Sequence, residues 1–213
     1  ALGYHALQVN TVGASNVAVG TLALDSNTTA SNNTAVGYSS LAANTTGLYN
    51  SGFGSSALLA NTTGGSNTAL GIDSLRVNTT GSNNVAVGGN ALDANTTASN
   101  NTAVGYLSLS ANTTGADNTA TGHGALLANT TGIQNSAFGR ASMDSNTTGA
   151  NNSSLGYTAL QKTTTGSGNT GLGHGALRQN TTASNNTAVG KAALATNTTG
   201  TQNVAVGSLA GDA

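Results

Sequence analysis

The sequence predicts an all-β protein, a β-solenoid or β-roll of about 12.5 coils with 17 residues per coil. Glycine recurs every 17 residues without an insertion or a deletion. A repeat of this length is shorter than the roughly 30 residues that a helical-hairpin repeat needs. Frequent Gly, Asn and Thr also disfavour helix. The repeats begin at Gly3, Gly20, Gly37, Gly54, Gly71, Gly88, Gly105, Gly122, Gly139, Gly156, Gly173, Gly190 and Gly207.

The composition excludes several classes of protein. The 213 residues include 5 basic and 6 acidic side chains, five Tyr, two Phe, and no Trp, Pro or Cys. Without Cys there is no disulfide and no thiolate site. A net charge of −1 gives no electrostatic footprint for nucleic acid, and no apolar run approaches the ~20 residues that span a bilayer. We therefore expect neither nucleic-acid binding nor membrane insertion.

The repeat itself predicts which positions lie inside. Counted from its glycine as position 1, it reads Gly-Tyr-x-Ala-Leu-x-Ala-Asn-Thr-Thr-Gly-x-Asn-Asn-Thr-Ala-Val. In complete repeats, charges occur only at positions 2, 3, 6, 7 and 13, so these positions face water. We expect Leu at position 5 and Val at position 17 to face inward, with Asn-Thr-Thr-Gly forming turns. Residues 1–213 form one array, and we expect it to belong to a longer chain or filament because solenoids need atypical terminal repeats.

Position 14 is Asn in all twelve complete repeats. In a parallel stack, each such side chain lies above its counterpart and can satisfy its amide on the neighbouring coils. We expect a structural ladder of Asn16, Asn33, Asn50, Asn67, Asn84, Asn101, Asn118, Asn135, Asn152, Asn169, Asn186 and Asn203.

Small residues fill position 16, next to the Val at position 17. Because neighbours on a strand point to opposite faces, an inward Val places this row outside, where another chain can approach closely. We expect self-association there, packed as a parallel homotrimer or also as an end-to-end polymer; the alternative is packing beneath a loop of the same coil. The contact row is Ala18, Ala35, Ala69, Ala86, Ala103, Ala120, Ala137, Ala188 and Ala205.

Asn-x-Thr, the acceptor pattern for N-glycosylation, recurs at position 8. The alternative interpretation is that Asn-Thr-Thr is a turn with stacked Thr, and O-linked sugars on the Thr pair are a third. The acceptor residues would be Asn27, Asn44, Asn61, Asn78, Asn95, Asn112, Asn129, Asn146, Asn180 and Asn197, with a sparser second set of Asn32, Asn100, Asn151 and Asn185. Thr arrays also suggest ice binding, which needs Thr on one flat face; adjacent Thr on a strand, however, point to opposite sides.

No pattern indicates catalysis or a metal site. His123 and His174 share position 2 but lie three coils apart, ~14 Å at the usual strand spacing, and His5 is remote from both in sequence. The Asp residues are dispersed, without the paired carboxylates of acid–base catalysis. We expect no enzyme, no metal and no cofactor; covalent glycans are the one attached group that the sequence leaves open.

Segments Asn33–Tyr38, Asn101–Tyr106 and Asn186–Lys191, which read NTAVGY, NTAVGY and NTAVGK, carry a family resemblance. They resemble the NTAVGYxALxxNTTG arrays of bacterial and phage tail-fibre-like proteins. More loosely, they resemble the head repeats of trimeric autotransporter adhesins. The resemblance implies a left-handed trimer in an extracellular fibre, at a cell surface or in a phage virion.

These observations predict a non-enzymatic structural component of an extracellular fibre or filament, a stiff repetitive rod that carries sugars in one variant of the hypothesis. The alternative is an adhesin or receptor-binding tail fibre that recognises surface glycans through outward Tyr4, Tyr38, Tyr106 and Tyr157. A weaker alternative is an ice-binding protein.

Overall fold

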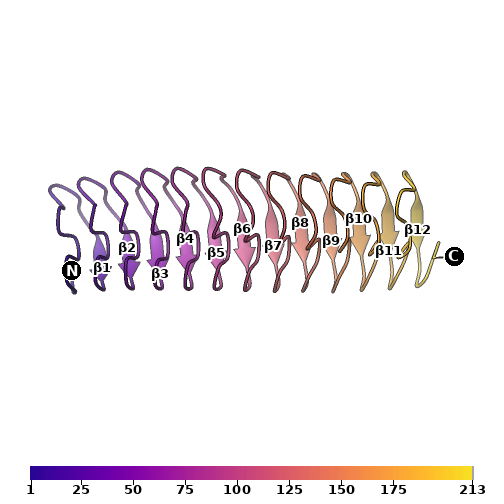
Figure 1. The fold of residues 1–213 in the computed structure, drawn as a ribbon, viewed down its shortest axis with the longest axis horizontal. Helices are drawn as coiled ribbons and strands as arrows, with labels where there is room; N and C mark the ends of the chain where they lie inside the picture. Colours follow the sequence, from indigo (N-terminus) through magenta and orange to yellow (C-terminus); the bar gives the residue numbers. More distant parts are fainter. Residues whose placement is uncertain (213) are drawn as a thin grey trace. The chain divides into compact units, whose positions relative to one another are not determined.

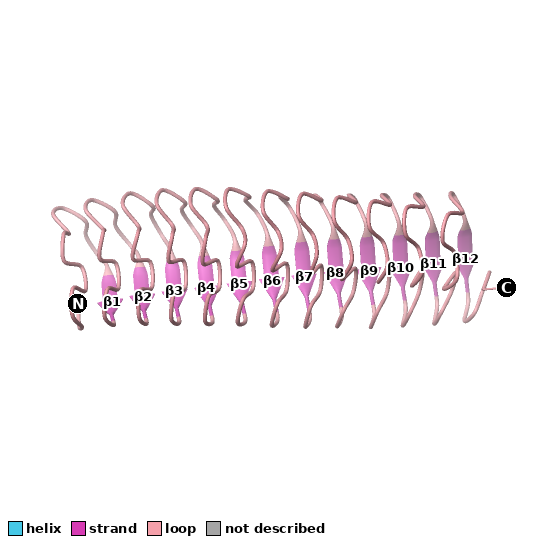
Figure 2. Ribbon diagram, in the orientation of Figure 1, coloured by secondary structure: helices cyan, strands magenta, loops and turns pink. Residues whose placement is uncertain are grey.

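The computed structural model describes residues 1–212, and Ala213 lies outside the described residues. Residues 1–212 form an all-β parallel solenoid and contain no helix (Figures 1 and 2). The chain divides into two compact parts, the N-terminal segment (residues 1–106) and the C-terminal segment (from residue 107). In each segment, one short strand recurs in every turn and turns of irregular backbone connect the strands.

Each segment contains six strands of three residues, formed by positions 15 to 17 of successive repeats. Neighbouring strands pair in parallel and in register, so that Ala18 pairs with Ala35 and Ala120 with Ala137. Every residue therefore lies beside the residue 17 positions away. The N-terminal segment contains β1 (Val17–Val19), β2 (Thr34–Val36), β3 (Ser51–Phe53), β4 (Thr68–Leu70), β5 (Val85–Val87) and β6 (Thr102–Val104). The C-terminal segment contains β7 (Thr119–Thr121), β8 (Ser136–Phe138), β9 (Ser153–Leu155), β10 (Thr170–Leu172), β11 (Thr187–Val189) and β12 (Val204–Val206).

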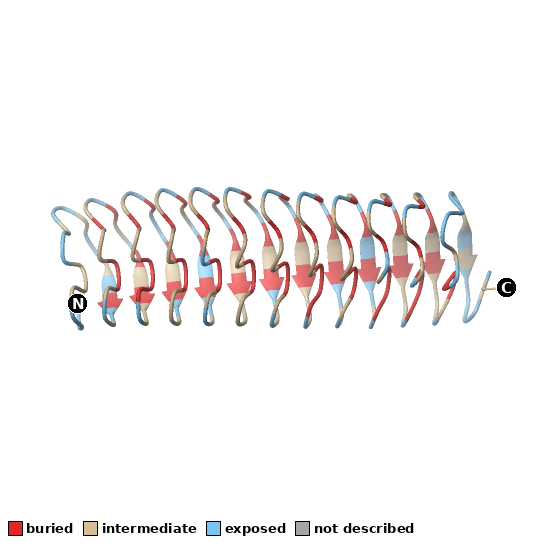
Figure 3. Ribbon diagram, viewed as in Figure 1, coloured by how far each residue is buried: buried red, intermediate tan, exposed pale blue. Residues whose placement is uncertain are grey.

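The core of each turn holds one large side chain, at position 5. This residue is fully buried from Leu24 to Leu177, with Met143 in the one turn that lacks Leu. The inward orientation of position 5 is confirmed. Ala or Ser at position 4, such as Ala57 and Ser74, packs beside it without exposure. Figure 3 shows the resulting buried centre of the strands and the buried wall opposite them.

The orientation predicted for the strand is wrong, because position 16 faces the core and position 17 faces outward. Leu70 and Leu155, at position 17, are 50% and 56% exposed. A Cβ at Gly52 (position 16) would lie 2.6 Å from Ser40 Oγ and 3.5 Å from Leu41 Cδ1, so the opposite wall leaves room only for a small side chain. The row predicted for contact between chains is fully buried at Ala18, Ala35, Ala69, Ala86, Ala103, Ala120, Ala137 and Ala188, and partly buried at Ala205.

The glycine at position 1 marks a corner that no other residue fits. Gly71 has φ +140°, in the region that L-residues avoid. A Cβ on Gly71 would lie 2.6 Å from the carbonyl carbon and oxygen of Gly88 in the next turn. Within each segment, the glycines of the row from Gly3 to Gly88 and from Gly122 to Gly190 meet the next in the same way, so the recurrence of glycine follows from the close stacking of backbones at this corner.

The buried residue at position 5 adopts a left-handed backbone, with φ 51° at both Leu75 and Met143. A β-branched side chain at positive φ is strongly disfavoured, whereas an unbranched Cβ is tolerated. This conformation explains why position 5 carries Leu or Met and never Val or Ile in the complete repeats.

Candidate functional site

The most regular chemical feature of each segment is the row of buried Asn side chains at position 8. In the N-terminal segment, Nδ2 of each Asn donates to Oδ1 of the Asn one turn earlier, at 2.8–3.1 Å from Asn27 to Asn95. The same Nδ2 donates its second hydrogen to the backbone carbonyl at position 11 of its own turn, as Asn61 does to Gly64 at 2.9 Å. The row is therefore an amide-to-amide ladder inside the solenoid, which we call the position-8 ladder.

This ladder corrects the interpretation of position 8 as a glycosylation site. N-linked sugar is attached to Nδ2, and in the folded chain this atom is enclosed and uses both hydrogens. The predicted acceptors Asn27, Asn44, Asn61, Asn78, Asn95, Asn112, Asn129, Asn146 and Asn180 are fully buried, and Asn197 is partly buried. The second set, Asn32, Asn100, Asn151 and Asn185, is exposed at position 13.

The Asn row at position 14 also links successive turns, through backbone partners. Asn33 Nδ2 donates to the carbonyl of Gly47 at 2.9 Å, and Asn33 Oδ1 accepts from the backbone N–H of Asn50 at 2.8 Å. The pattern repeats in both segments, for example at Asn135 with Gly149 and Asn152. Where both rows carry Asn, a position-11 carbonyl can receive one bond from each row, as Gly47 does from Asn33 and Asn44.

One turn of the C-terminal segment breaks the position-8 ladder. Thr163 replaces Asn there and is fully buried. Its hydroxyl accepts from Asn180 Nδ2 at 3.5 Å, which is long for a hydrogen bond. On the other side, Asn146 Oδ1 is buried without a hydrogen-bond partner. A buried acceptor without a partner costs about 1–3 kcal/mol, so this turn is the weak point of the ladder.

The two Thr rows differ in exposure. At position 9, the hydroxyl donates to the backbone carbonyl of the Thr one turn later, as Thr45 does to Thr62 at 3.1 Å. At position 10 the side chain is exposed, as at Thr46 and Thr63. Only the position-10 row therefore presents free hydroxyls to solvent or to an attached sugar.

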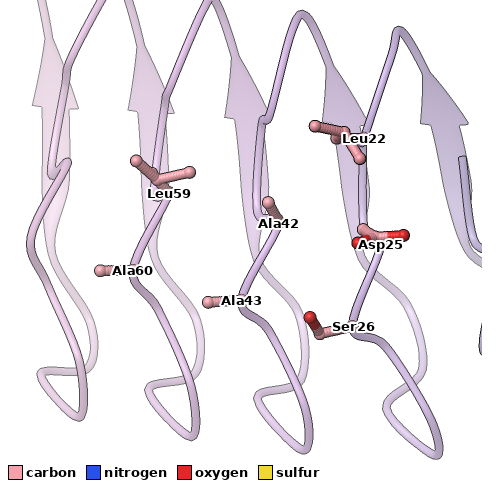
Figure 4. Close-up of a pocket in the computed structure, with 7 residues that line it drawn as sticks. All are labelled: Leu22, Asp25, Ser26, Ala42, Ala43, Leu59 and Ala60. Atoms are coloured by element: carbon pink, nitrogen blue, oxygen red, sulfur yellow. The ribbon is translucent and has the colours of Figure 1, made fainter. Parts of the chain in front are cut away.

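A shallow groove of about 340 Å³ lies on the N-terminal segment where positions 3, 6 and 7 of three successive turns meet (Figure 4). Small side chains in the middle turn, Ala42 and Ala43, leave the hollow between their larger neighbours. Asp25 brings the one carboxylate, and its Oδ1 is buried without a hydrogen-bond partner. The lining is Leu22, Asp25, Ser26, Ala42, Ala43, Leu59 and Ala60. A single carboxylate among alkyl groups lacks the second acid–base group of a catalytic pair.

Three charged residues of the N-terminal segment, Asp73, Arg76 and Asp93, lie near one another. Arg76 Nε lies 3.8 Å from Asp73 Oδ1. Burial raises the pKa of Asp93 above its ordinary value of 3.8, although a hydrogen bond with Asn90 and the charge of Arg76 oppose the shift. Within residues 1–212, no three His, Asp or Glu side chains come close enough to share a metal ion.

His123 and His174 lie on the surface of the C-terminal segment, and Tyr157 occupies the turn before His174. The Tyr157 and His174 rings stack, with centroids 5.4 Å apart. In the N-terminal segment, Tyr4 stacks on its neighbour His5 at 3.9 Å. The four tyrosines predicted to face outward, Tyr4, Tyr38, Tyr106 and Tyr157, are all exposed. No helix in the described part of the chain could cross a bilayer.

Comparison with protein-family models, with curated proteins and with solved structures finds no match to this chain.

Proposed function

We propose that the chain is a non-enzymatic structural component of an extracellular fibre or filament. The observation that supports this role is the pair of Asn rows that bond each turn to the next inside both segments. A conventional core holds its layers by non-directional burial. Here, directional hydrogen bonds between identical turns oppose both sliding and separation, which are the deformations that a fibre resists.

The proposal is tested on material from the source organism. An antibody raised against the chain should label extracellular filaments in electron micrographs. Oriented filaments should give the ~4.8 Å axial reflection of stacked strands. Label confined to the cell interior, or filaments without that reflection, would overturn the proposal.

We further propose that filament assembly joins copies of this chain as a homotrimer through the outward face of the strands. Positions 15 and 17 carry no charge in any turn, and position 17 exposes Phe53 and Leu70 in one segment and Phe138 and Leu155 in the other. An apolar, uncharged row repeated in register favours a partner with the same row, which a second copy provides.

This contact is tested by light scattering on three variants. Leu70→Glu/Leu155→Glu should lower the assembled mass while the circular dichroism spectrum stays unchanged. Ser66→Glu, at an exposed position off the strand, is the matched control and should assemble normally. Ala69→Glu should unfold the chain, because it buries an unpaired charge. An unchanged mass for the double variant would exclude this surface.

Sugar decoration, where it occurs, belongs on the exposed Asn32, Asn100, Asn151 and Asn185 or on the position-10 Thr row. A modified native chain would exceed the polypeptide mass of 20.5 kDa. Glycopeptide mapping should then find sugar at position 13 or 10 and none at position 8. Sugar on a position-8 Asn would contradict the fold.

A second candidate function is recognition of surface glycans, and the exposed tyrosines at position 2 support it. Tyr38 and Tyr106 are 58% and 52% exposed, so they present aromatic surface to solvent. Binding across such repeats predicts that affinity rises with the number of position-2 tyrosines retained. Replacing Tyr38, Tyr106 and Tyr157 with Thr, the residue that position 2 carries at Thr21, should weaken glycan binding progressively as each tyrosine is removed; unchanged binding would exclude this role.

A further inference from the structure

Position 2 of the C-terminal segment carries cationic and aromatic side chains in four successive turns. They are Arg140, Tyr157, His174 and Lys191, which we call the basic stripe; His123 occupies the turn before them. The Arg140 guanidinium lies over the Tyr157 ring, 5.6 Å from its centroid. The Tyr157 and His174 rings stack 5.4 Å apart at an interplanar angle of 19°. These contacts order neighbouring side chains into one column.

The two cations of the basic stripe, Arg140 and Lys191, lack an acidic partner within residues 1–212. Arg140, His174 and Lys191 are exposed. Within residues 1–212, neither Arg140 nor Lys191 forms an ion pair, whereas Arg76 of the N-terminal segment pairs with Asp73. The acidic side chains of the C-terminal segment occur at positions 6 and 13, and none occurs at position 2.

The basic stripe is specific to one segment. At position 2, the N-terminal segment carries Tyr4, Thr21, Tyr38, Ser55, Ile72, Gly89 and Tyr106, with no cation among them. All these residues occupy the same place in the turn as the stripe. The solenoid therefore does not require positive charge there, so the presence of Arg140 and Lys191 within four consecutive turns calls for another explanation.

Exposed apolar side chains accompany the stripe. Phe138 and Leu155 lie two residues before Arg140 and Tyr157, and they are 40% and 56% exposed. On a copy whose strand face is not covered by a partner, a ligand along the stripe would meet hydrogen-bond donors and cations beside apolar surface. That combination suits a sugar polymer, which presents acidic groups and also C–H faces.

We propose that the basic stripe binds a linear acidic polysaccharide, whose carboxylate or sulfate groups accept charge-assisted hydrogen bonds from Arg140 and Lys191, with a ring N–H of His174 as a further donor. The stacked geometry argues against single-stranded nucleic acid, which uses open aromatic faces as platforms for its bases. Here Tyr157 and His174 each turn one face toward the other, and the Arg140 guanidinium also lies over the Tyr157 ring, so these rings offer fewer open faces to bases than such platforms do. This inference goes beyond the proposed structural role, because a fibre needs no ligand.

The test uses the whole chain, with polygalacturonate and dextran sulfate as anionic probes and neutral dextran as the control polymer. Wild type should bind both anionic polymers at low ionic strength, lose affinity as salt is added, and ignore neutral dextran. Arg140→Thr/Lys191→Thr follows the Thr found at position 2 in another turn, so the fold should be retained. We expect it to bind about tenfold more weakly, since two exposed ion pairs contribute up to about 1 kcal/mol each.

The matched control removes the same charge elsewhere on the same segment. In Lys162→Ala/Arg178→Ser, each new residue already occurs at the same position of another turn, so the fold should be retained. This variant should keep affinity within about twofold of wild type. Equal losses in the two double variants would show attraction by net charge alone and overturn the assignment. Absence of binding to both anionic polymers, or tighter binding of single-stranded DNA than of either at the same salt, would also overturn it.

Discussion

Restoring the position-8 ladder at its one break should stabilise the C-terminal segment. In a Thr163→Asn variant, the new Nδ2 can donate to the unpartnered Asn146 Oδ1 and to the Gly166 carbonyl. That carbonyl now accepts only from Asn152, at 2.8 Å. The new Oδ1 can accept from Asn180, replacing the present 3.5 Å contact. Asn occupies this position in the turns on either side, so the side chain fits without rearrangement.

The expected gain follows from these bonds. Satisfying a buried acceptor recovers about 1–3 kcal/mol, and each additional hydrogen bond contributes about 1 kcal/mol, partly offset by burying a larger polar group. We expect a net gain of about 2 kcal/mol, or a rise of roughly 4–8 °C in the unfolding midpoint for a chain of this size. The assay is thermal and urea unfolding followed by circular dichroism.

Two further variants make the prediction refutable. Asn78→Thr introduces the same break into the N-terminal segment, and it should lower stability by a similar amount, about 2 kcal/mol. Thr163→Val removes the hydroxyl without adding an amide, and its cost should be at most about 1 kcal/mol because the bond lost is weak. A Thr163→Asn variant no more stable than wild type would refute the ladder as a source of stability.

Three other predictions follow from the backbone and from the charges. Gly71→Ala should lower the free energy of unfolding by about 2–5 kcal/mol in a urea titration, since the positive φ and the overlap with the next turn both oppose a Cβ. Gly89→Ala is the control and should be nearly neutral, because a Cβ there would contact only side chains at 3.4 Å or more. Leu75→Ile should cost at least about 2 kcal/mol at its left-handed φ, whereas Leu75→Met should cost less than ~1.5 kcal/mol; equal losses in thermal melts would contradict the conformational argument. Asp93→Asn should be more stable than wild type at neutral pH. The raised pKa means that the folded state binds the proton more tightly, so wild-type stability falls as pH rises from 3.8 through the folded pKa. Urea midpoints for both proteins across that range should therefore converge toward acid pH, and divergence there would contradict the sign.

The repeat length and the buried row at position 5 could be predicted because both follow from periodicity. Periodicity could not decide which face of the strand is buried, because Val-Ala-Val alternates equally well with either Val or Ala toward the core. Hydrophobicity favours Val inside, yet the separation of the two walls at Gly52 admits only a small side chain. That separation is a property of the whole turn and is not encoded in the three strand residues.

The role of position 8 was missed for a related reason. Asn-Thr-Thr matches a local acceptor pattern, and a local pattern carries no information about what lies one turn above. Two signals in the sequence favour a buried ladder: positions 8 to 12 carry no charge in any complete repeat, and only Thr163 replaces Asn at position 8. The basic stripe has no local signal in the sequence, because its members lie 17 residues apart and share only their position in the repeat.

The position-8 ladder also gives each segment a polarity. Every amide points the same way, with Nδ2 toward the preceding turn and Oδ1 toward the following one. Aligned amide dipoles reinforce one another, so one end of such a stack presents donors and the other presents acceptors. Stacked copies would match donors with acceptors only head to tail, whereas head-to-head contact would oppose like dipoles. A filament built on this ladder would therefore have chemically distinct ends and a direction of growth.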